Sequence, residues 1–303
     1  MRIIDAGQVR DVGFVAATQA IVDALQAGLD PASGPPRIGM DLPAGQMLLM
    51  PAHDSAAGVK VVTIAPRNAE HGLPRIQATY LLFDGRTLAL QALIDGTALT
   101  TLRTPALSMA GALAFIRNRA LDVVIIGCGP QAIGHAEALA AHRQVGSLTY
   151  LVRGAARRHL AADAAQAILG SPAANRALGS ADVVVCATSA REPLFDSHLL
   201  RPEVVVMAVG SHEANAREVD ADLMGRALVI VEDVPTALRE AGDVAMAITE
   251  GTLSAGDLGT LAEVVRGEIP ACADRPVVVK TVGMAWEDLA VASACYRAAS
   301  AAR

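Results

Sequence analysis

Aromatic residues are scarce in this sequence. They make up 3% of its 303 residues, whereas 52% are hydrophobic, so the apolar content is mainly Ala, Val and Leu. Such a mixture suits helices packed on a parallel sheet better than a β-sandwich. The length leaves room for two domains with separate cores.

Long hydrophobic runs are absent as well. The longest, over residues 106–116, is shorter than the roughly 18–20 apolar residues that a membrane-spanning helix needs. The opening residues, Met-Arg-Ile-Ile-Asp, lack the apolar core of a secretory signal. These two absences lead us to expect a cytoplasmic protein with no membrane partner.

Cysteine and positive charge are both sparse. The four cysteines lie far apart, with neither a Cys-x-x-Cys pair nor a partner at metal-ligand spacing, which argues against a disulfide framework and against a metal site. The net charge of −6, without a basic stripe that alternates with aromatics, argues against a nucleic-acid partner. An inward-pointing group of basic residues in so acidic a chain would therefore indicate a small anionic ligand.

Two successive patterns divide the chain. In the first part, a helical period over residues 11–27 and a Pro-rich connector precede four strand-like runs, with a hairpin signal at Asp84-Gly85. A mostly apolar helix is expected over 104–120. From residue 121 onward, short β-rich runs alternate with helical stretches, which is typical of βαβ units. We therefore predict an α/β protein, with an α+β region followed by a doubly wound parallel sheet.

A glycine-rich turn follows the first β-rich run of the second region. It reads G-x-G-x-x-A, comes directly after a β-branched run, and opens a helix. The small residues allow a tight turn, let backbone amides approach a pyrophosphate, and let the helix approach the strand. This context favours a Rossmann-type dinucleotide site over a purely structural turn. We assign the dinucleotide to Gly127, Gly129, Pro130, Gln131 and Ala132.

The end of the next predicted strand indicates which dinucleotide binds. NAD sites usually place Asp or Glu there to accept hydrogen bonds from the ribose, but here Arg153 follows the strand and Arg158 lies close behind. A cation suits the 2′-phosphate of NADP(H). We expect NADP(H) to be preferred and NAD(H) to be possible. The alternative is that these arginines decorate a surface helix.

Three basic residues precede the cofactor region in contexts that suggest burial. Arg37 follows the Pro-rich connector, Lys60 lies within an apolar strand, and Arg103 starts an apolar helix. A buried lysine without a partner is costly. Each cation should therefore have either a carboxylate neighbour or an anion site, and these residues alone leave both explanations open.

Several short motifs occur in order along nearly the whole chain. They are Gly58-Val59-Lys60, Gly72-Leu73-Pro74, Asp95-Gly96, Leu102-Arg103-Thr104, Glu240-Ala241-Gly242-Asp243 and the run from Lys280 to Ala290. In combination they resemble the ornithine cyclodeaminase/mu-crystallin family. The resemblance implies a homodimer in which residues 1–120 and 284–303 bind the substrate and form the interface, while residues 121–283 bind NAD(P). It also implies that Arg37, Lys60 and Arg103 hold a substrate α-carboxylate beside the nicotinamide.

Further cofactor contacts are expected after other strands of the second region. Ligands of open α/β sheets bind at the carboxyl ends of the strands, and Thr188 and Ser189 stand at such an end. We add Gly210, Val282 and Gly283 to the expected cofactor residues.

Two positions depart from the pattern of the true cyclodeaminases. Those enzymes have a catalytic aspartate after Gly-Gly, where this chain has Val209-Gly210-Ser211-His212. They also have a glutamate one residue before Leu-Met-Pro, where Leu48 stands here, and an apolar side chain cannot hold a distal ammonium group. Both changes favour the simpler chemistry of the family, the reduction of an α-imino acid.

The expected reaction is NADPH-dependent reduction of a cyclic α-imino acid, such as Δ1-pyrroline-2-carboxylate or Δ1-piperideine-2-carboxylate, to the L-amino acid. The three cations would pin the carboxylate so that the imine carbon faces C4 of the nicotinamide. A protonated imine needs no strong acid, whereas a neutral one needs a donor, for which Lys60 and His212 are the candidates. The alternatives are an alanine-dehydrogenase-type enzyme, an ornithine cyclodeaminase and a non-catalytic cofactor-binding protein.

Overall fold

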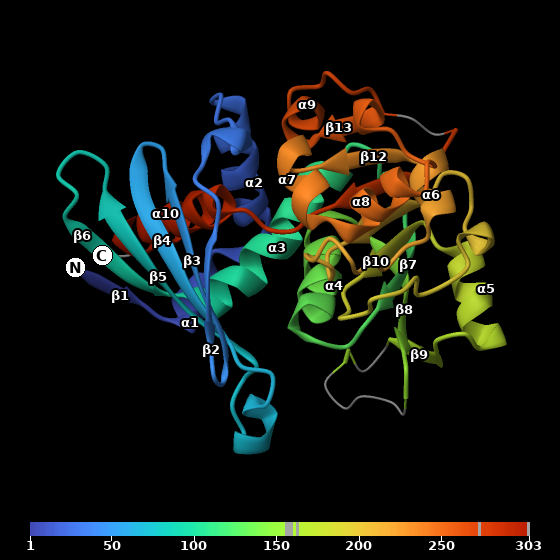
Figure 1. Cartoon of the computed structure of the whole chain (residues 1–303), viewed down its shortest axis with the longest axis horizontal. Coiled ribbons are helices and arrows are strands. Elements are labelled where there is room, and N and C mark those ends of the chain that lie inside the picture. Colours follow the sequence, from blue (N-terminus) through green and yellow to red (C-terminus); the bar gives the residue numbers. More distant parts are fainter. Residues whose placement is uncertain (155–159, 162–163, 272–273, 302–303) are drawn as a thin grey trace. The chain divides into compact units, whose positions relative to one another are not determined.

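The computed structural model describes residues 1–154, 160–161, 164–271 and 274–301, and its chain divides into two compact units (Figure 1). Unit 1 comprises Met1–Leu107 and Met284–Arg303, and unit 2 comprises Ser108–Gly283. No helix within the described ranges is long and apolar enough to cross a membrane.

Unit 1 contains a six-stranded sheet. Its strands are β1 (Arg2–Ile4), β2 (Ile38–Leu42), β3 (Gly45–His53), β4 (Ala56–Ile64), β5 (Ile76–Asp84) and β6 (Leu90–Asp95), in the spatial order β1-β6-β5-β4-β3-β2. The four predicted strands form the antiparallel meander β3 to β6, while β1 pairs in parallel with β6 and β2 adds an edge. The 3-10 turns η1 (Pro31–Ser33) and η2 (Asn68–His71) lie in its loops.

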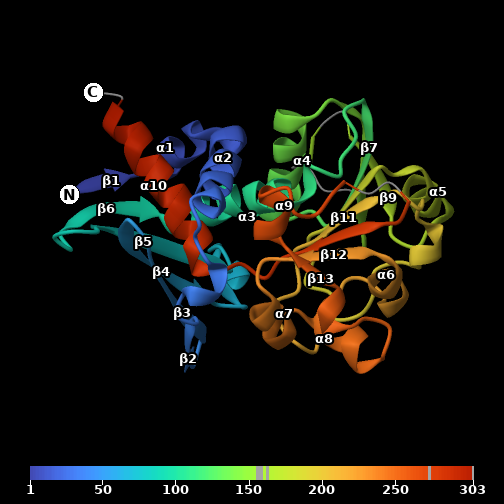
Figure 2. The same cartoon turned by 90° about the horizontal axis from the view of Figure 1, so that it is seen from above.

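Helices of unit 1 pack against this sheet. They are α1 (Ala6–Asp11), α2 (Gly13–Gln26), the first part of α3 (Gly96–Ala112), and α10 (Ala285–Ala301). Helix α10 contacts β3, β4 and β5 as well as α2, so the C-terminal helix returns to the first unit as expected (Figure 2). Strands β3 to β5 alternate toward this layer, and Lys60 is the one buried charged side chain that the described strands of the sheet carry.

Helix α3 differs from the expected helix over 104–120. It begins at Gly96, because the carboxylate of Asp95 accepts the amide of Ala98 at 2.9 Å and so caps the first turn. Pro105, next to the expected start at residue 104, lies in the interior of α3. The boundary between the units falls after Leu107, inside α3, so the sequence-based boundary after residue 120 lies beyond the end of the helix.

Unit 2 is built on an eight-stranded sheet in which all neighbours are parallel. Its strands are β7 (Leu121–Ile126), β8 (Val145–Val152), β9 (Ala165–Ile168), β10 (Val183–Cys186), β11 (Val205–Ala208), β12 (Leu228–Val231), β13 (Leu258–Thr260) and β14 (Val277–Lys280). Every residue of β10, β11, β12 and β14 is buried, which is typical of strands covered on both faces.

Helices alternate with these strands. They are α4 (Pro130–His142), α5 (Pro172–Ser180), α6 (Ala221–Arg226), α7 (Val234–Glu240), α8 (Gly242–Thr249) and α9 (Leu261–Val265), with the 3-10 turns η3 (Ser197–Leu199) and η4 (Ala255–Asp257). The strand order β13-β12-β14-β11-β10-β7-β8-β9 reverses its direction between β7 and β10. This is the switch point of a doubly wound sheet, where ligands bind beyond the carboxyl ends of the strands. The predicted Rossmann-type sheet is confirmed.

Candidate active site

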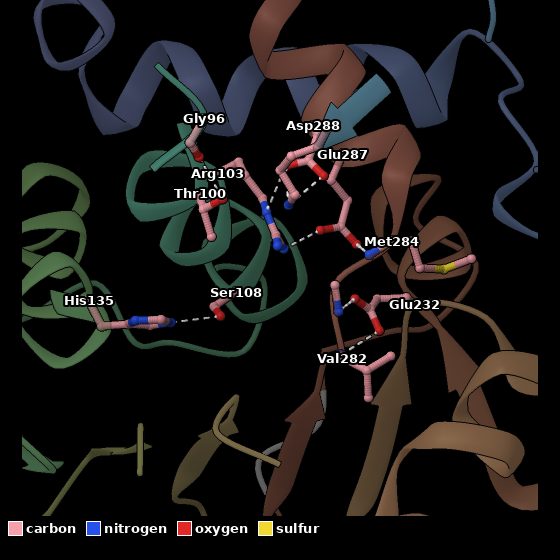
Figure 3. A network of polar contacts seen from close by, with 12 residues as sticks. Gly96, Thr100, Arg103, Ser108, His135, Glu232, Val282, Met284, Glu287 and Asp288 are labelled. Carbon is pink, nitrogen blue, oxygen red and sulfur yellow. Dashed lines mark hydrogen bonds and ion pairs between the residues drawn. The ribbon is translucent and has the colours of Figure 1, made fainter. Parts of the chain in front are cut away.

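Two of the three expected substrate-binding cations meet at the start of α10 in unit 1. The ammonium nitrogen of Lys60 lies 2.9 Å from Oδ1 and 2.8 Å from Oδ2 of Asp288. Arg103 donates from Nε to Asp288 Oδ1 at 3.2 Å and from Nη1 to Glu287 Oε2 at 2.7 Å (Figure 3). All four side chains are at most 8% exposed. The carboxylate neighbours that the sequence left as an alternative are therefore present for Lys60 and Arg103.

The two acids stand in the first turn of α10. Glu287 accepts the backbone amide of Met284 on Oε1 at 2.7 Å, which caps the start of the helix while Oε2 holds Arg103. Acidic side chains in a first turn are also favoured by the helix dipole. Asp288 has no such capping contact, because its hydrogen bonds and ion pairs within the described residues all go to Lys60 and Arg103.

Burial is the largest influence on the pKa of Lys60 and on that of Tyr80. It lowers the pKa of Lys60 from 10.5 to about 8, against the opposing effect of the Asp288 carboxylate. Tyr80, which pairs with Lys60 across β4 and β5, is fully buried, and its hydroxyl has no hydrogen-bond partner among the described residues. Burial and the charge of Asp288 raise the pKa of Tyr80 well above its usual value, so the hydroxyl keeps its proton.

The third expected cation stands elsewhere in the sheet of unit 1. Arg37 is half-buried directly before β2, and β3 separates that strand from β4, which carries Lys60. Leu48 lies on β3 with its side chain 8% exposed, and it shares a face with Met50, the direct cross-strand neighbour of Lys60. The position that holds a glutamate in the cyclodeaminases is thus a buried apolar residue on the lysine-bearing face.

In unit 2, the glycine-rich turn after β7 has the geometry that a pyrophosphate requires. Gly127 has φ +123°, and a Cβ there would lie 2.5 Å from the carbonyl oxygen of Ala187. A Cβ on Gly129 would meet nothing within 4 Å, and α4 begins at Pro130 without a side-chain cap on its first amides. Ala132 is fully buried, as close helix–strand packing demands. These residues fit a dinucleotide, because the start of an uncapped helix favours an anion and the Cβ position of Gly129 is open.

The loops after β10 and β11 are held together by Glu218. This buried carboxylate accepts three hydrogen bonds. Thr188 donates from its amide at 2.8 Å and from its hydroxyl at 2.7 Å, and Gly210 donates from its amide at 2.7 Å. Burial raises the pKa of Glu218, and Lys280 and the Thr188 hydroxyl act in the opposite direction. Because the hydroxyl proton of Thr188 goes to Glu218, a cofactor can only donate to this oxygen. Ser189 is exposed beside it.

A second buried acid and a lysine stand behind Glu218. Asp243, in the first turn of α8, accepts the amides of Glu218 at 2.7 Å and Val219 at 3.0 Å. Its other oxygen lies 2.9 Å from the ammonium group of Lys280, which also donates to the carbonyl oxygen of Ser211 at 2.6 Å. The ends of β10, β11 and β14 are thereby tied to α8. Sequence reasoning gave no role to Glu218, Asp243 or Lys280, although Asp243 and Lys280 stand in two of the motifs that carry the family resemblance.

Another carboxylate engages the residues after β14. Glu232, at the end of β12 and 3% exposed, accepts the amides of Val282 at 2.8 Å and Gly283 at 2.7 Å (Figure 3). A cofactor contact with Val282 or Gly283 would therefore involve atoms other than these two N–H groups.

Helix α4 carries a buried histidine just past the glycine-rich turn. His135 Nδ1 lies 2.7 Å from the carbonyl oxygen of Gln131, and Nε2 lies 2.9 Å from the hydroxyl of Ser108 (Figure 3). Burial lowers the pKa of His135 from 6.5 to about 4, so the ring is neutral at neutral pH. Because Nδ1 faces a carbonyl oxygen, it carries the hydrogen, and Nε2 accepts from Ser108.

The remaining predicted residues lie at the surface or outside the described part. His212 is exposed after the buried Ser211, whose hydroxyl donates to the carbonyl oxygen of Ala216. Arg153 is exposed directly after β8 and forms no ion pair with any residue that the structure describes. Arg158 lies outside the described residues. Within the described ranges, no group of three or more His, Cys, Asp or Glu side chains is placed to bind a metal.

Comparison with known proteins assigns the family. The model of the ornithine cyclodeaminase/mu-crystallin family matches residues 6–303. The chain is 35% identical over 253 residues to a Δ1-pyrroline-2-carboxylate reductase of Bacillus cereus, covering 80% of this chain and 78% of that protein. It is 34% identical over 306 residues to a Δ1-pyrroline-2-carboxylate/Δ1-piperideine-2-carboxylate reductase of Azospirillum brasilense, covering 97% and 95%.

A solved structure extends this likeness to the whole chain. The Δ1-pyrroline-2-carboxylate reductase of Thermococcus litoralis, in complex with NADH and L-proline, has a TM-score of 0.88 and 25% identity, covering 100% of this chain and 98% of that one. Sequence and fold therefore agree from the first strand to the C-terminal helix. The chain belongs to the ornithine cyclodeaminase/mu-crystallin family.

Proposed function

We propose that the protein reduces a cyclic α-imino acid, such as Δ1-pyrroline-2-carboxylate or Δ1-piperideine-2-carboxylate, to the L-amino acid by hydride transfer from a nicotinamide cofactor. The observation that carries this proposal is the identity of about a third, over most of the chain, to reductases of these two imines. Within unit 1, the buried Lys60 and Arg103 supply the cations that an α-carboxylate needs.

In this proposal, Lys60 and Arg103, with Arg37, hold the substrate carboxylate. An ammonium group has three N–H donors, and the hydrogen bond and ion pair of Lys60 within the described residues reach Asp288 alone. Lys60 thus keeps donor capacity for an incoming carboxylate. With a pKa of about 8, it is protonated at neutral pH and is also the candidate donor to a neutral imine; His212 is the second candidate.

Unit 2 supplies the cofactor site. The bound nicotinamide provides the hydride, and the chain provides its placement. The amides around Gly129 bind the pyrophosphate, and the Gly127 turn brings the strand close enough for this contact. Thr188 accepts a hydrogen bond from the cofactor, because its own proton is held by Glu218.

We propose further that NADP(H) is preferred over NAD(H). Arg153 follows β8 directly, and no acidic residue occurs between residues 151 and 162 to accept hydrogen bonds from an unphosphorylated ribose. Arg153→Ala should lower kcat/KM with NADPH by about 10- to 150-fold, as expected for one lost charged hydrogen bond, and change kcat/KM with NADH little. The exposed Arg191 serves as the control position. An unchanged NADPH/NADH ratio would make the preference wrong.

A spectrophotometric screen tests the proposed reaction. The purified protein is supplied with NADPH or NADH and with each cyclic imine, and oxidation of the nicotinamide is followed. Turnover of pyruvate with ammonium in preference to both imines would indicate an alanine-dehydrogenase-type enzyme instead. Ammonia released from ornithine without net cofactor change would indicate cyclodeamination, which the apolar Leu48 disfavours. Cofactor binding without any turnover would refute an enzymatic role.

A homodimer in the cytoplasm completes the proposal. On the edge strand β2, Ile38, Met40 and Leu42 alternate and are 57%, 51% and 39% exposed, and the outer edge of β2 pairs with no described strand. Such apolar edges favour association. Light scattering should give twice the monomer mass, and Met40→Asp should halve it, whereas Val15→Asp on α2 should not. A monomeric wild type would refute the dimer, and recovery of the activity in a membrane fraction would refute the location.

A further inference from the structure

The hydroxyl of Thr188, at the start of the loop after β10, keeps one lone pair for a further hydrogen bond. It donates its hydrogen to Oε1 of Glu218 at 2.7 Å and accepts the amide of Ala190 at 3.1 Å, and these are its two hydrogen bonds within the described residues. A hydroxyl has one hydrogen and two lone pairs. Its remaining lone pair can only accept, so a ligand group at this position has to be a donor.

Glu218 is held in place by the fold itself. It is fully buried, and its two oxygens accept the amide and the hydroxyl of Thr188 and the amide of Gly210. Its own amide donates to Asp243 at 2.7 Å, and its carbonyl oxygen accepts the amide of Leu194 at 2.9 Å. A Cβ on Gly210 would lie 2.6 Å from Oε1 of Glu218, so the loop after β11 is pressed against the carboxylate. The hydrogen of the Thr188 hydroxyl is therefore fixed in one direction before any ligand binds.

Thr188 also lies directly beside the glycine-rich turn. A Cβ on Gly127 would lie 2.5 Å from the carbonyl oxygen of Ala187 and 3.6 Å from the methyl carbon of Thr188. In the sheet, β10 and β8 are the neighbours of β7 on opposite sides. A dinucleotide spans the switch point with one nucleotide on each side. Because the proposed contact with Arg153 places the adenosine ribose at the end of β8, the nicotinamide nucleotide belongs at the end of β10.

We propose that Glu218 is a positioning residue of the cofactor site: by holding the hydrogen of the Thr188 hydroxyl, it makes this oxygen accept a hydrogen bond from the ribose of the nicotinamide nucleotide. This rests on the proposed function in placing a dinucleotide at the turn after β7. The ribose is the first group beyond the pyrophosphate on the β10 side, and each of its two hydroxyls can donate. Because Glu218 is fully buried, it acts on the cofactor through Thr188.

Calorimetric titration of the full chain with NADP+ or NAD+, whichever binds more tightly, tests the acceptor without any turnover. Thr188→Val keeps the shape of the side chain but removes the oxygen, so it should weaken binding about fivefold or more, as expected when a donor loses its partner. Thr188→Ser keeps the hydroxyl and should bind within about twofold of wild type. Thr249→Val, which removes an exposed hydroxyl of α8, is the control and should leave the affinity unchanged.

A double-mutant cycle decides whether Glu218 acts through this hydroxyl. Glu218→Gln places an NH2 group opposite a donor of either Thr188 or Gly210, so the direction of the Thr188 hydroxyl is no longer fixed. It should weaken cofactor binding about fivefold or more beside Thr188, but less than about twofold in the Thr188→Val background. Glu218→Asp, which is one methylene shorter, should show the same pattern. Glu268→Gln, exposed in unit 2, is the control.

Cofactor analogues identify the group that donates to Thr188. Two of them carry a nicotinamide ribose that lacks either its 2′-hydroxyl or its 3′-hydroxyl. A third carries 3-acetylpyridine, which lacks the NH2 group of nicotinamide but leaves the ribose intact. The loss of affinity caused by Thr188→Val should disappear with one of the two deoxy analogues and remain with the third analogue.

Several results would overturn the inference. An undiminished effect of Glu218→Gln in the Thr188→Val background would make Glu218 a structural residue, and so would failure of both Glu218 variants to fold. A Thr188→Val effect that vanishes with the acetylpyridine analogue, or persists with both deoxy analogues, would contradict the ribose contact. Unchanged affinity of Thr188→Val, or no cofactor binding by wild type, would do the same. Imine reduction is scored separately: a protein that binds the cofactor but reduces no imine would contradict the proposed reaction and leave the positioning role intact.

Discussion

Replacement of Lys280 by methionine is the sharpest test of the network in unit 2. Lys280 is 1% exposed, and Asp243, its ion-pair partner at 2.9 Å, is fully buried. Methionine has a similar length, so the packing at the end of β14 is largely kept while the charge and the bond to Ser211 are lost. The variant therefore isolates the electrostatic contribution of the lysine.

The expected loss is large because one partner of a buried pair remains behind. Removing one member of such a pair costs about 3–5 kcal/mol of unfolding free energy. Glu218 makes this loss depend on pH. Burial raises the pKa of Glu218 above 4.5, and in the wild type the charge of Lys280 opposes that rise. Without the lysine, folded Glu218 holds its proton more tightly, and unfolding free energy falls as pH rises from the unfolded pKa to the folded one. The deficit of Lys280→Met should thus shrink on acidification toward pH 4.5.

Urea unfolding at several pH values measures this deficit. Far-ultraviolet circular dichroism follows the secondary structure of both units, while fluorescence of the single tryptophan, Trp286, reports on unit 1 and should change little. Arg191→Met is the matched control: its pair with Glu213 is about half exposed on both sides and should contribute less than about 1 kcal/mol. A deficit for Lys280→Met no larger than that of the control, or one independent of pH, would refute the reasoning.

Three further changes test separate features. Tyr80→Phe should raise the urea midpoint by the equivalent of about 1 kcal/mol, since it removes a buried hydroxyl without a described partner; a lower midpoint would contradict this. Gly129→Ala should leave stability unchanged, because an added Cβ meets nothing within 4 Å, yet weaken NADPH binding about tenfold or more in a fluorescence titration; unchanged binding would remove the pyrophosphate from this turn. Burial lowers the pKa of His135 to about 4, so the unfolding free energy should fall by up to about 1.4 kcal/mol per pH unit as pH falls from 6.5 toward 4. His135→Gln should flatten this pH dependence, and an equal slope in variant and wild type would contradict the assignment to His135.

The parallel sheet and the glycine-rich turn were predictable because their signals are local. Strands such as β10 (Val183–Cys186) are buried on both faces and so read as continuous apolar runs, which periodicity detects. The edge strand β2 was missed because all of its residues are exposed, so the strand has no buried face to produce an alternating apolar pattern. The start of α3 was misplaced because Asp95, which caps the first turn, is the last residue of strand β6 and lies outside the apolar run that suggested a helix over 104–120.

No local pattern could pair the cations with their particular carboxylates. Lys60 and Arg103 stood out as charges in apolar surroundings, but their carboxylates lie 228 and 184–185 residues away along the chain. Only the return of α10 to the sheet of unit 1 brings Glu287 and Asp288 to them. The sequence therefore indicated which residues carry buried charge, whereas the net charge of the cluster depends on tertiary packing.

The two buried charge clusters differ in what compensates them, and this difference separates their roles. In unit 2, Glu218 and Asp243 outnumber Lys280, yet four backbone amides and a hydroxyl donate to the two carboxylates. Carboxylates that are held mainly by backbone amides take their positions when the chain folds. Such a network is suited to holding loops in place at the edge of the sheet. In unit 1, the amide of Met284 donates to Glu287, and the ion pairs described for the cluster join side chains of opposite charge. Such pairs can exchange a partner for a ligand without breaking backbone structure, which is what a substrate site requires.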